Sequence, residues 1–300
     1  MSDAIEIIDV SPRDGLQNES TLLETETKLE LIARLIAAGV RRLEATSFVH
    51  PRLVPAMADA EAVMEGVDRT DGVSYIGLVL NERGLERAIA ADCDEVNYAV
   101  VVSDTFSREN QGTSTDEGIA VWHSIARKAQ ASGVPASLVV SAAFGCPFEG
   151  EISPGRVAEV VERCLTEQPS RLSLADTIGV ASPADVVERF GAIMPSIPDQ
   201  VQVGAHFHNT RGTGLANVAA AVDIGIRSFD ASLGGLGGCP FAPNATGNIS
   251  TEDTVYMLHR MGFTTGLDLE ALAETADWVE QYLPGYVVGL YHRAGPFPRG

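Results

Sequence analysis

The stretch QVGAHFHNT, residues 202–210, places His206 and His208 two positions apart at the end of an apolar run. Side chains alternate along a β-strand, so residues two apart project from the same face. Both imidazoles are therefore expected to point at one spot, where two lone pairs form a common half of a divalent-metal site. The two-histidine pattern alone also allows a structural explanation, in which one histidine is a core residue and the other stands two positions away by chance. A metal site therefore requires further ligands elsewhere in the chain.

Outward from this stretch, short β-rich runs alternate with amphipathic helical patterns along most of the 300 residues. Strands are predicted over residues 5–10, 42–48, 74–80, 95–103, 135–144, 171–175, 201–208 and 227–233. Helices are predicted over residues 24–38, 56–65, 82–91, 115–132, 153–167, from 182 onward, 214–224 and 251–261. About eight strand-then-helix units predict an α/β fold, a TIM (β/α)8 barrel.

An open, doubly wound sheet is the structural alternative, but it usually has fewer strands and a glycine-rich phosphate turn after the first. Here the first turn is PRDGL, residues 12–16, which is no dinucleotide fingerprint. After the eighth unit, residues 267–283 predict one further helix, followed by an irregular tail rich in Pro and Gly. We therefore expect a single domain over residues 1–300, with the barrel over about 4–265 and the C-terminal helix and tail over 266–300.

Composition excludes several partners. A net charge of -20 argues against nucleic acid and against an anionic membrane, because both require a cationic face. The four cysteines form no CxxC pair, which favours reduced thiols and a cytoplasmic location. The N-terminus shows no targeting segment, and no apolar run approaches the ~20 residues of a membrane helix.

Polar residues gather where the predicted strands end, and in a parallel barrel those ends converge on one mouth. These residues are Arg13 and Asp14 after the first strand, Glu44 in the second, Asp176 after the sixth, the two histidines in the seventh, and Asn248 beyond the eighth. Asp14 offers a carboxylate oxygen and Asn248 an amide oxygen. With two imidazoles this set suits Mg²⁺ or Mn²⁺ better than a closed thiolate zinc site. Singly, Asp14 could cap a turn and Asn248 could begin a helix; their joint placement favours the metal site.

The eighth strand runs into GGLGGCP, residues 234–240. Glycines permit tight turns, and the same freedom lets a loop open and close over a substrate, carrying the Cys239 thiol into and out of the site. Cys146 also lies in a Gly-Cys-Pro triplet but has no comparable glycine run, so a structural role is predicted for it.

Five segments carry a family resemblance: SPRDGLQNE (11–19), EATSFV (44–49), LADTIG (174–179), the two-histidine stretch and residues 234–248. Together they resemble the 3-hydroxy-3-methylglutaryl-CoA (HMG-CoA) lyase family, which belongs to the metal-dependent DRE-TIM barrel lyases and synthases. The resemblance extends to about residue 266. It implies Mg²⁺ or Mn²⁺ bound by Asp14, His206, His208 and Asn248, an acyl-CoA substrate cleaved to acetyl-CoA and acetoacetate, and a homodimer.

The resemblance also implies roles for individual side chains. Arg13 would stabilise the enolate oxygen formed when the carbon–carbon bond breaks, because it is always cationic. His206 would share in proton transfer, and Cys239 would protonate the acetyl-CoA carbanion. Glu44 and Asp176 would position water, Arg13 and the substrate. Substrate binding is assigned to Arg13, Gln17 and Thr177.

Asn209 stands where the family usually has Asp, which removes a possible charge behind the histidines. This departure leaves the ligands intact, so it bears on the acyl specificity more than on the reaction type. Three alternatives remain open. One is a lyase for a related branched 3-hydroxyacyl-CoA. Another is a Claisen condensing enzyme of the isopropylmalate or homocitrate synthase kind, which usually carries a regulatory extension and lacks the GLGGCP loop. The last is a non-catalytic metal-binding barrel.

Overall fold

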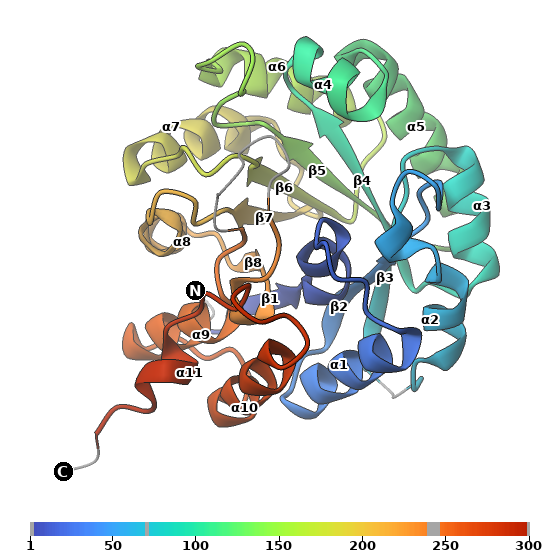
Figure 1. Cartoon of the computed structure of the whole chain (residues 1–300). Coiled ribbons are helices and arrows are strands. Elements are labelled where there is room, and N and C mark those ends of the chain that lie inside the picture. Colours follow the sequence, from blue (N-terminus) through green and yellow to red (C-terminus); the bar gives the residue numbers. More distant parts are fainter. Residues whose placement is uncertain (1–2, 70–71, 239–246, 299–300) are drawn as a thin grey trace.

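Eight parallel strands pair in chain order, and the last pairs with the first to close a barrel (Figure 1). The computed structural model describes residues 3–69, 72–238 and 247–298. The strands are β1 (Glu6–Asp9), β2 (Arg42–Ser47), β3 (Ser74–Leu78), β4 (Glu95–Val101), β5 (Ala136–Ser141), β6 (Arg171–Asp176), β7 (Gln202–Phe207) and β8 (Ser228–Ala231). The predicted TIM barrel is therefore confirmed.

Helices surround the barrel on the outside (Figure 1). They are α1 (Thr25–Ala37), α2 (Ala60–Gly66), α3 (Glu82–Ala90), α4 (Asp104–Gln111), α5 (Thr115–Ala131), α6 (Pro154–Cys164), α7 (Pro183–Ile193), α8 (Gly214–Asp223), α9 (Thr251–Arg260), α10 (Leu269–Glu280) and α11 (Tyr291–Ala294). Within the described residues, no helix combines the length and the apolar character needed to cross a bilayer.

Serine caps place several of these helices where the sequence predicts them. The Ser153 side chain accepts a hydrogen bond from the Arg156 backbone N–H at the start of α6. At α7, Ser182 and Asp185 form a reciprocal capping box. Such side chains satisfy backbone N–H groups that the first helical turn leaves without partners. With a proline after each serine, the start of both helices is fixed locally.

Three local predictions differ from the structure. The predicted helix over 56–65 is split into a 3₁₀ turn (Pro55–Met57) and α2. Helix α4 was not predicted, because its polar sequence DTFSRENQ has no apolar repeat; a Ser103 cap begins it and Gly112, at φ 71°, ends it. The predicted first strand ends at Asp9, and a π-helical turn (Ser11–Gly15) follows. This turn carries Arg13 and Asp14 to the mouth of the barrel.

The C-terminal segment, predicted to be irregular, is tied to the barrel by specific contacts. The Asp253 carboxylate accepts hydrogen bonds from the backbone N–H groups of Leu290 and Tyr291, where the short helix α11 begins. The backbone N–H groups of Val288 and Gly289 both donate to the carbonyl oxygen of Gly234. The segment therefore supports the base of the glycine-rich loop that follows β8.

Candidate active site

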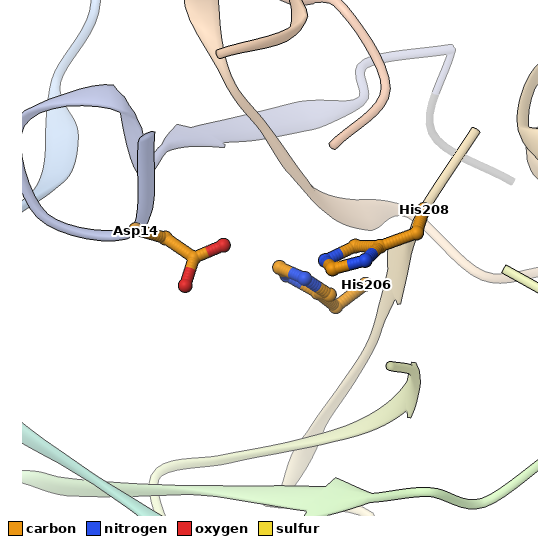
Figure 2. Close-up of side chains that lie close together, drawn as sticks. All are labelled: Asp14, His206 and His208. Atoms are coloured by element: carbon orange, nitrogen blue, oxygen red, sulfur yellow. The ribbon is translucent and has the colours of Figure 1, made fainter. Parts of the chain in front are cut away.

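Asp14, His206 and His208 converge at the carboxyl ends of the strands. Asp14 lies in the turn after β1, and the histidines lie at the end of β7. Each residue offers one potential ligand atom, and these atoms lie within 4.8 Å of one another. In Figure 2 both imidazoles are turned toward the Asp14 carboxylate. Three of the four residues that the sequence assigns to one metal site are thus brought together.

Asn248 completes the group from the far side of the glycine-rich loop. It pairs with His208 in an isolated antiparallel bridge, and its Nδ2 donates hydrogen bonds to Asp14 Oδ2 (2.8 Å) and to the Leu236 carbonyl oxygen (3.1 Å). These two bonds fix the orientation of the amide. The predicted ligand beyond the eighth strand therefore lies against Asp14, from which it is 234 positions distant in sequence.

Two buried atoms at this place make no hydrogen bond within the described part of the chain: Asn248 Oδ1 and His208 Nδ1. A buried polar atom without a partner costs about 1–3 kcal/mol, so such atoms are uncommon unless a ligand, an ion or water satisfies them. A carboxylate, two imidazoles and an amide oxygen form a donor set suited to a divalent cation such as Mn²⁺ or Mg²⁺. The residues present therefore fit a metal.

Two of the candidate ligands, Asp14 and His208, hold free lone pairs at neutral pH. Burial, assisted by the neighbouring His206, lowers the pKa of His208 to about 4, so its imidazole is neutral. Burial alone would raise the pKa of Asp14, but the positive charge of Arg13 outweighs it and the pKa lies well below its usual value. A cation approaching the cluster would not have to displace protons from these two groups.

A carboxylate from the neighbouring strand fixes the orientation of His206. The Nδ1 of His206 lies 3.3 Å from Asp230 Oδ2, which leaves Nε2 of His206 as the nitrogen available to a metal. The other oxygen of Asp230 pairs with Arg171. Burial raises the pKa of Asp230, but the charge of Arg171 outweighs this effect and the pKa is lowered overall.

Asp230 was not among the site residues predicted from the sequence. A signal was available, because this carboxylate is the one charged residue within residues 228–233 of the predicted strand. It is also the register partner of His206 across the β7–β8 pair, but that pairing was not visible from the sequence.

Arg13 is held between two carboxylates. Its Nη1 lies 2.6 Å from Asp14 Oδ1, and its Nε and Nη2 contact Glu44 Oε2. The other oxygen of Glu44 accepts a hydrogen bond from Asn97 Nδ2 at 3.0 Å. Burial raises the pKa of Glu44, and the charge of Arg13 opposes that effect. Glu44 and Asn97 thus fix the guanidinium beside the metal-ligand cluster, which comprises the candidate ligands Asp14, His206, His208 and Asn248.

A cavity of about 440 Å³ opens over this cluster. Its polar lining includes Arg13, Asp14, Gln17, Glu44, Asn97, Thr177, His206, His208 and Asp230. Its apolar lining includes Val10, Leu53, Leu78, Val101 and Phe106. The volume lies within the range of small-molecule sites. The cation of Arg13 and the potential metal ligands therefore face the same space.

Gln17 and Thr177, the predicted substrate-binding residues beside Arg13, both line this cavity. Gln17 Oε1 is buried and makes no hydrogen bond to a described residue. Thr177 is anchored, because its Oγ1 accepts a hydrogen bond from the Ala142 backbone N–H at 2.9 Å. Both residues are thus placed where a bound molecule can contact them.

Asp176 is placed differently from the other predicted residues. Its two oxygens accept hydrogen bonds from the backbone N–H groups of Val180 and Ala181, both at 2.9 Å. It is not among the described residues that line the cavity. The carboxylate therefore stabilises the loop after β6, which also carries Thr177.

The predicted proton donor Cys239 lies outside the described residues. The chain before it is anchored close to the cluster: a side chain at Gly237 would collide with Asn248 Nδ2 and the Asp14 backbone, and Asn18 Nδ2 donates to the Gly238 carbonyl oxygen at 3.1 Å. Cys146 is buried, and its Sγ accepts hydrogen bonds from the Phe148 and Glu149 backbone N–H groups. These contacts are those of a structural thiol that stabilises a turn.

Asn209 lies next to His208, and its Oδ1 accepts a hydrogen bond from the Gly214 backbone N–H at the start of α8. An amide supplies this acceptor as well as a carboxylate does. Asn209, at a position where the resemblance implies Asp, therefore supplies a helix-capping contact without a negative charge close to the histidines.

A second group of potential ligands, Asp277, Glu280 and His292, lies at the surface. His292 Nδ1 is already 2.7 Å from Asp277 Oδ1, and 62% of the Asp277 side chain is exposed. None of the three lines the cavity at the barrel mouth. We therefore interpret this group as a surface ion pair.

Comparison with known proteins places these features in context. Residues 4–279 match the family model HMGL-like. The chain is 43% identical to (R)-citramalyl-CoA lyase of Chloroflexus aurantiacus, over 98% of this chain and 96% of that protein. It is 42% identical to hydroxymethylglutaryl-CoA lyase YngG of Bacillus subtilis, over 92% of each.

Solved structures agree with the sequence relatives. The HMG-CoA lyase of Bacillus subtilis matches with a TM-score of 0.94 and 40% identity, over 98% of this chain and 99% of that one. The HMG-CoA lyase of Acinetobacter baumannii, solved with coenzyme A and 3-methylmalate, matches with a TM-score of 0.93 and 39% identity, over 99% of each.

Proposed function

The chain belongs to the HMGL-like family, and from this premise we propose that it is a divalent-metal-dependent lyase that cleaves HMG-CoA to acetyl-CoA and acetoacetate. The observation that carries the proposal is the convergence of Asp14, His206 and His208 beside Arg13 in one cavity. A metal site alone would suit a binding protein. A fixed cation next to it gives the means to stabilise an oxyanion during bond cleavage.

The proposed reaction is a retro-aldol cleavage. A base removes the proton of the 3-hydroxyl group, and the bond between C2 and C3 breaks as the C3–O group becomes the ketone of acetoacetate. The electron pair of the broken bond passes to the thioester, forming an enolate. Protonation of its carbon gives acetyl-CoA. Held by Asp14, His206, His208 and Asn248, Mg²⁺ or Mn²⁺ would supply the Lewis acidity that lowers the pKa of the substrate hydroxyl.

Arg13 stabilises the enolate oxygen in this proposal. Its guanidinium stays charged at any working pH, and Glu44 and Asp14 hold it in place before the reaction begins. A preorganised cation acts where negative charge develops and needs no rearrangement at that moment. Glu44, oriented by Asn97, is thus a positioning residue for Arg13.

Proton transfer is assigned to His206 and Cys239. His206 contacts Asp230 through Nδ1, and this contact together with the nearby negative charges raises its pKa, although burial opposes the charged form. Cys239 is proposed as the acid that protonates the acetyl-CoA carbanion. We assign Asp176 an indirect part, because its oxygens hold the loop that carries Thr177.

A second substrate, citramalyl-CoA, is favoured by a specific observation: the relative named (R)-citramalyl-CoA lyase is 43% identical over 98% of this chain. Citramalyl-CoA has its carboxylate directly on the carbinol carbon, whereas HMG-CoA has one more methylene between them. The same cleavage would then give acetyl-CoA and pyruvate. Because a hydrophobic pocket distinguishes one methylene by only about 1–3 kcal/mol, the two substrates must be compared directly.

A product assay tests the proposal. Metal-stripped protein is given Mg²⁺ or Mn²⁺ and each thioester separately, and acetyl-CoA, acetoacetate and pyruvate are followed by mass spectrometry. Metal-dependent formation of acetoacetate from HMG-CoA, with the higher kcat/KM, supports the proposed function. A higher kcat/KM for citramalyl-CoA assigns the second substrate instead. Absence of both reactions in protein that binds metal refutes both.

Three finer properties are also proposed: Mg²⁺ or Mn²⁺ as the resident metal, a homodimer, and a cytoplasmic location. The set of oxygen and imidazole donors supports the metal, and the dimers usual in the family support the homodimer. The free thiols of Cys93, Cys146 and Cys164 among the described cysteines support the cytoplasmic location. Elemental analysis of protein as purified and light scattering measure the first two. Cell fractionation measures the third.

A further inference from the structure

A buried arginine lies inside the barrel next to the residue that orients His206. Arg171 begins β6, and only 5% of its side chain is exposed. Its Nη2 lies 2.8 Å from Asp230 Oδ1, and its Nε donates a hydrogen bond to Ser228 Oγ at 3.0 Å. An arginine buried this deeply in a barrel core requires a partner of opposite charge, and Asp230 provides it.

Gly204, in the neighbouring strand β7, provides the space for this guanidinium. A Cβ atom at position 204 would lie 2.3 Å from Arg171 Nη2 and 2.6 Å from its Cζ. Any other amino acid there would force the arginine to move. Because Gly204 has no side chain, there is room beside it for the guanidinium of Arg171.

The contact extends to the metal-ligand cluster through Asp230. One oxygen of Asp230 pairs with Arg171, and the other lies 3.3 Å from His206 Nδ1. Neither Arg171 Nη2 nor Asp230 Oδ1 forms a well-aligned hydrogen bond in their contact, so the attraction is one between charges. One oxygen of the Asp230 carboxylate is consequently held by the Arg171 cation, and the other faces the imidazole of His206.

We propose that Arg171 is a positioning residue for the metal centre: it holds the Asp230 carboxylate against His206 Nδ1, which presents Nε2 to the metal. Partners of metal-bound histidines orient the ring and fix its tautomer. Without Arg171, the carboxylate would lose the cation in direct contact with its Oδ1 and keep the longer-range attraction of Arg13 and Arg42. The inference rests on the proposed metal site and is independent of which thioester is cleaved.

The test measures Mn²⁺ affinity, from the electron paramagnetic resonance signal of free Mn²⁺, in full-length protein without substrate. Arg171→Met keeps most of the side-chain volume and removes the charge. It is expected to weaken Mn²⁺ binding about tenfold, the lower end of the effect known for residues that support metal ligands. Arg171→Lys, which retains the charge, should restore part of the affinity. Gly204→Ala should weaken binding as well, because it displaces the guanidinium.

Arg189→Met is the matched control. Arg189 lies on α7 with the same 5% side-chain exposure and pairs with Glu188 and the Ile152 carbonyl oxygen. Its loss should lower the free energy of unfolding and leave Mn²⁺ affinity unchanged. In a double-mutant cycle, Arg171→Met should have no further effect on Mn²⁺ binding once Asp230→Asn is present, since the two residues act through one contact.

Unchanged Mn²⁺ affinity in Arg171→Met, with only a loss of stability, would overturn the inference and make Arg171 structural. If Arg171→Met does not fold, unchanged affinity in Gly204→Ala overturns it equally. Parent protein that binds no Mn²⁺ refutes the proposed metal site and this inference together. Parent protein that binds Mn²⁺ but cleaves neither thioester refutes the proposed function alone.

Discussion

The two ends of the barrel interior both bury an arginine between carboxylates, yet they differ in what surrounds the pair. At the amino-terminal end, all three guanidinium nitrogens of Arg42 are bonded: Nε and Nη2 to Glu95, and Nη1 to Glu6 and Gln202. At the carboxyl end, Arg13 pairs with Glu44 and Asp14. There the neighbouring atoms Asn248 Oδ1 and His208 Nδ1 have no partner within the described chain.

The difference shows that a buried ion pair does not by itself mark an active site. Removing charges from water is costly at both ends, and good geometry offsets that cost. At the amino-terminal end the polar groups around Arg42 bind one another. At the carboxyl end the arrangement leaves a carboxylate, two imidazoles and an amide oxygen with capacity to bind something else. Potential ligand atoms without partners that gather at one cavity, rather than buried charge, support the proposal that the carboxyl end is the functional one.

Removal of a ligand should have the largest effect at the carboxyl end. His208→Ala deletes one of the two imidazoles and is expected to weaken Mn²⁺ binding by more than the roughly 10–100-fold typical of residues that only orient ligands. Turnover should disappear with the metal. Elemental analysis after dialysis measures the occupancy. Full occupancy in the variant would remove His208 from the set of ligands.

Removal of the Arg13 cation next to the candidate ligands should have the second-largest effect. Arg13→Met is expected to lower kcat by about 10²–10³-fold, because a preorganised group for the developing oxyanion is lost. Metal content, measured in the same preparation, should be retained. If the loss falls on KM alone, Arg13 only binds the substrate and does not act in the transition state.

Substitution of arginine by methionine at the amino-terminal end of the barrel should affect stability and not activity. Arg42→Met leaves Glu95 buried without its cation, which is expected to lower the free energy of unfolding by about 3 kcal/mol. Turnover and Mn²⁺ affinity should stay unchanged at a temperature where the variant is folded. Urea unfolding and steady-state kinetics measure the two effects. A fall in kcat at full stability would show that the two ends are coupled.

The smallest of the four effects is a pH dependence of stability caused by Glu252, a carboxyl group with no cation in contact with it among the described residues. Glu252 is fully buried at the base of the glycine-rich loop, where its Oε2 accepts a hydrogen bond from the Gly234 backbone N–H. Burial raises the pKa of Glu252 to about 7 from the ordinary 4.5. The folded protein therefore holds the proton that the unfolded chain loses above pH 4.5, and stability falls as the pH rises through 7.

The size of this effect follows from the shift in pKa. From Glu252 alone, the free energy of unfolding should be about 2 kcal/mol lower near pH 8 than near pH 5.5. Glu252→Gln should remove this difference, because the amide keeps an acceptor for Gly234 and carries no charge. Urea unfolding of metal-free protein at the two pH values tests it. An equal pH dependence in parent and variant would contradict the assignment.

Much of the fold was predictable because its signals are local. Each strand-then-helix unit carries its own periodicity, and the serine–proline starts of α6 and α7 fix those boundaries within a few residues. The two histidines share a face because of the period of a strand, and barrel topology brings Asp14 to them. These steps needed no knowledge of side-chain packing.

What escaped prediction depends on register and volume. Asp230 meets His206 because β7 and β8 pair in one particular register, and the run SFDA gives no indication of that partner. Arg171 reaches Asp230 through space that Gly204 leaves empty. The contacts of Asp176, at the end of β6, were not predicted either: its oxygens accept hydrogen bonds from backbone N–H groups four and five residues later, which anchor the loop.

The seam of the barrel has a consequence for the synthesis of the protein. The closing pair joins β1 to β8, and Asn248 reaches Asp14 across 234 positions of sequence. A nascent chain therefore cannot assemble the cluster until nearly all of the barrel has left the ribosome, since domains are made from the N-terminus onward and contacts this distant form late. A metal bound at this seam would stabilise the closed barrel, because it binds the folded protein and not the unfolded chain.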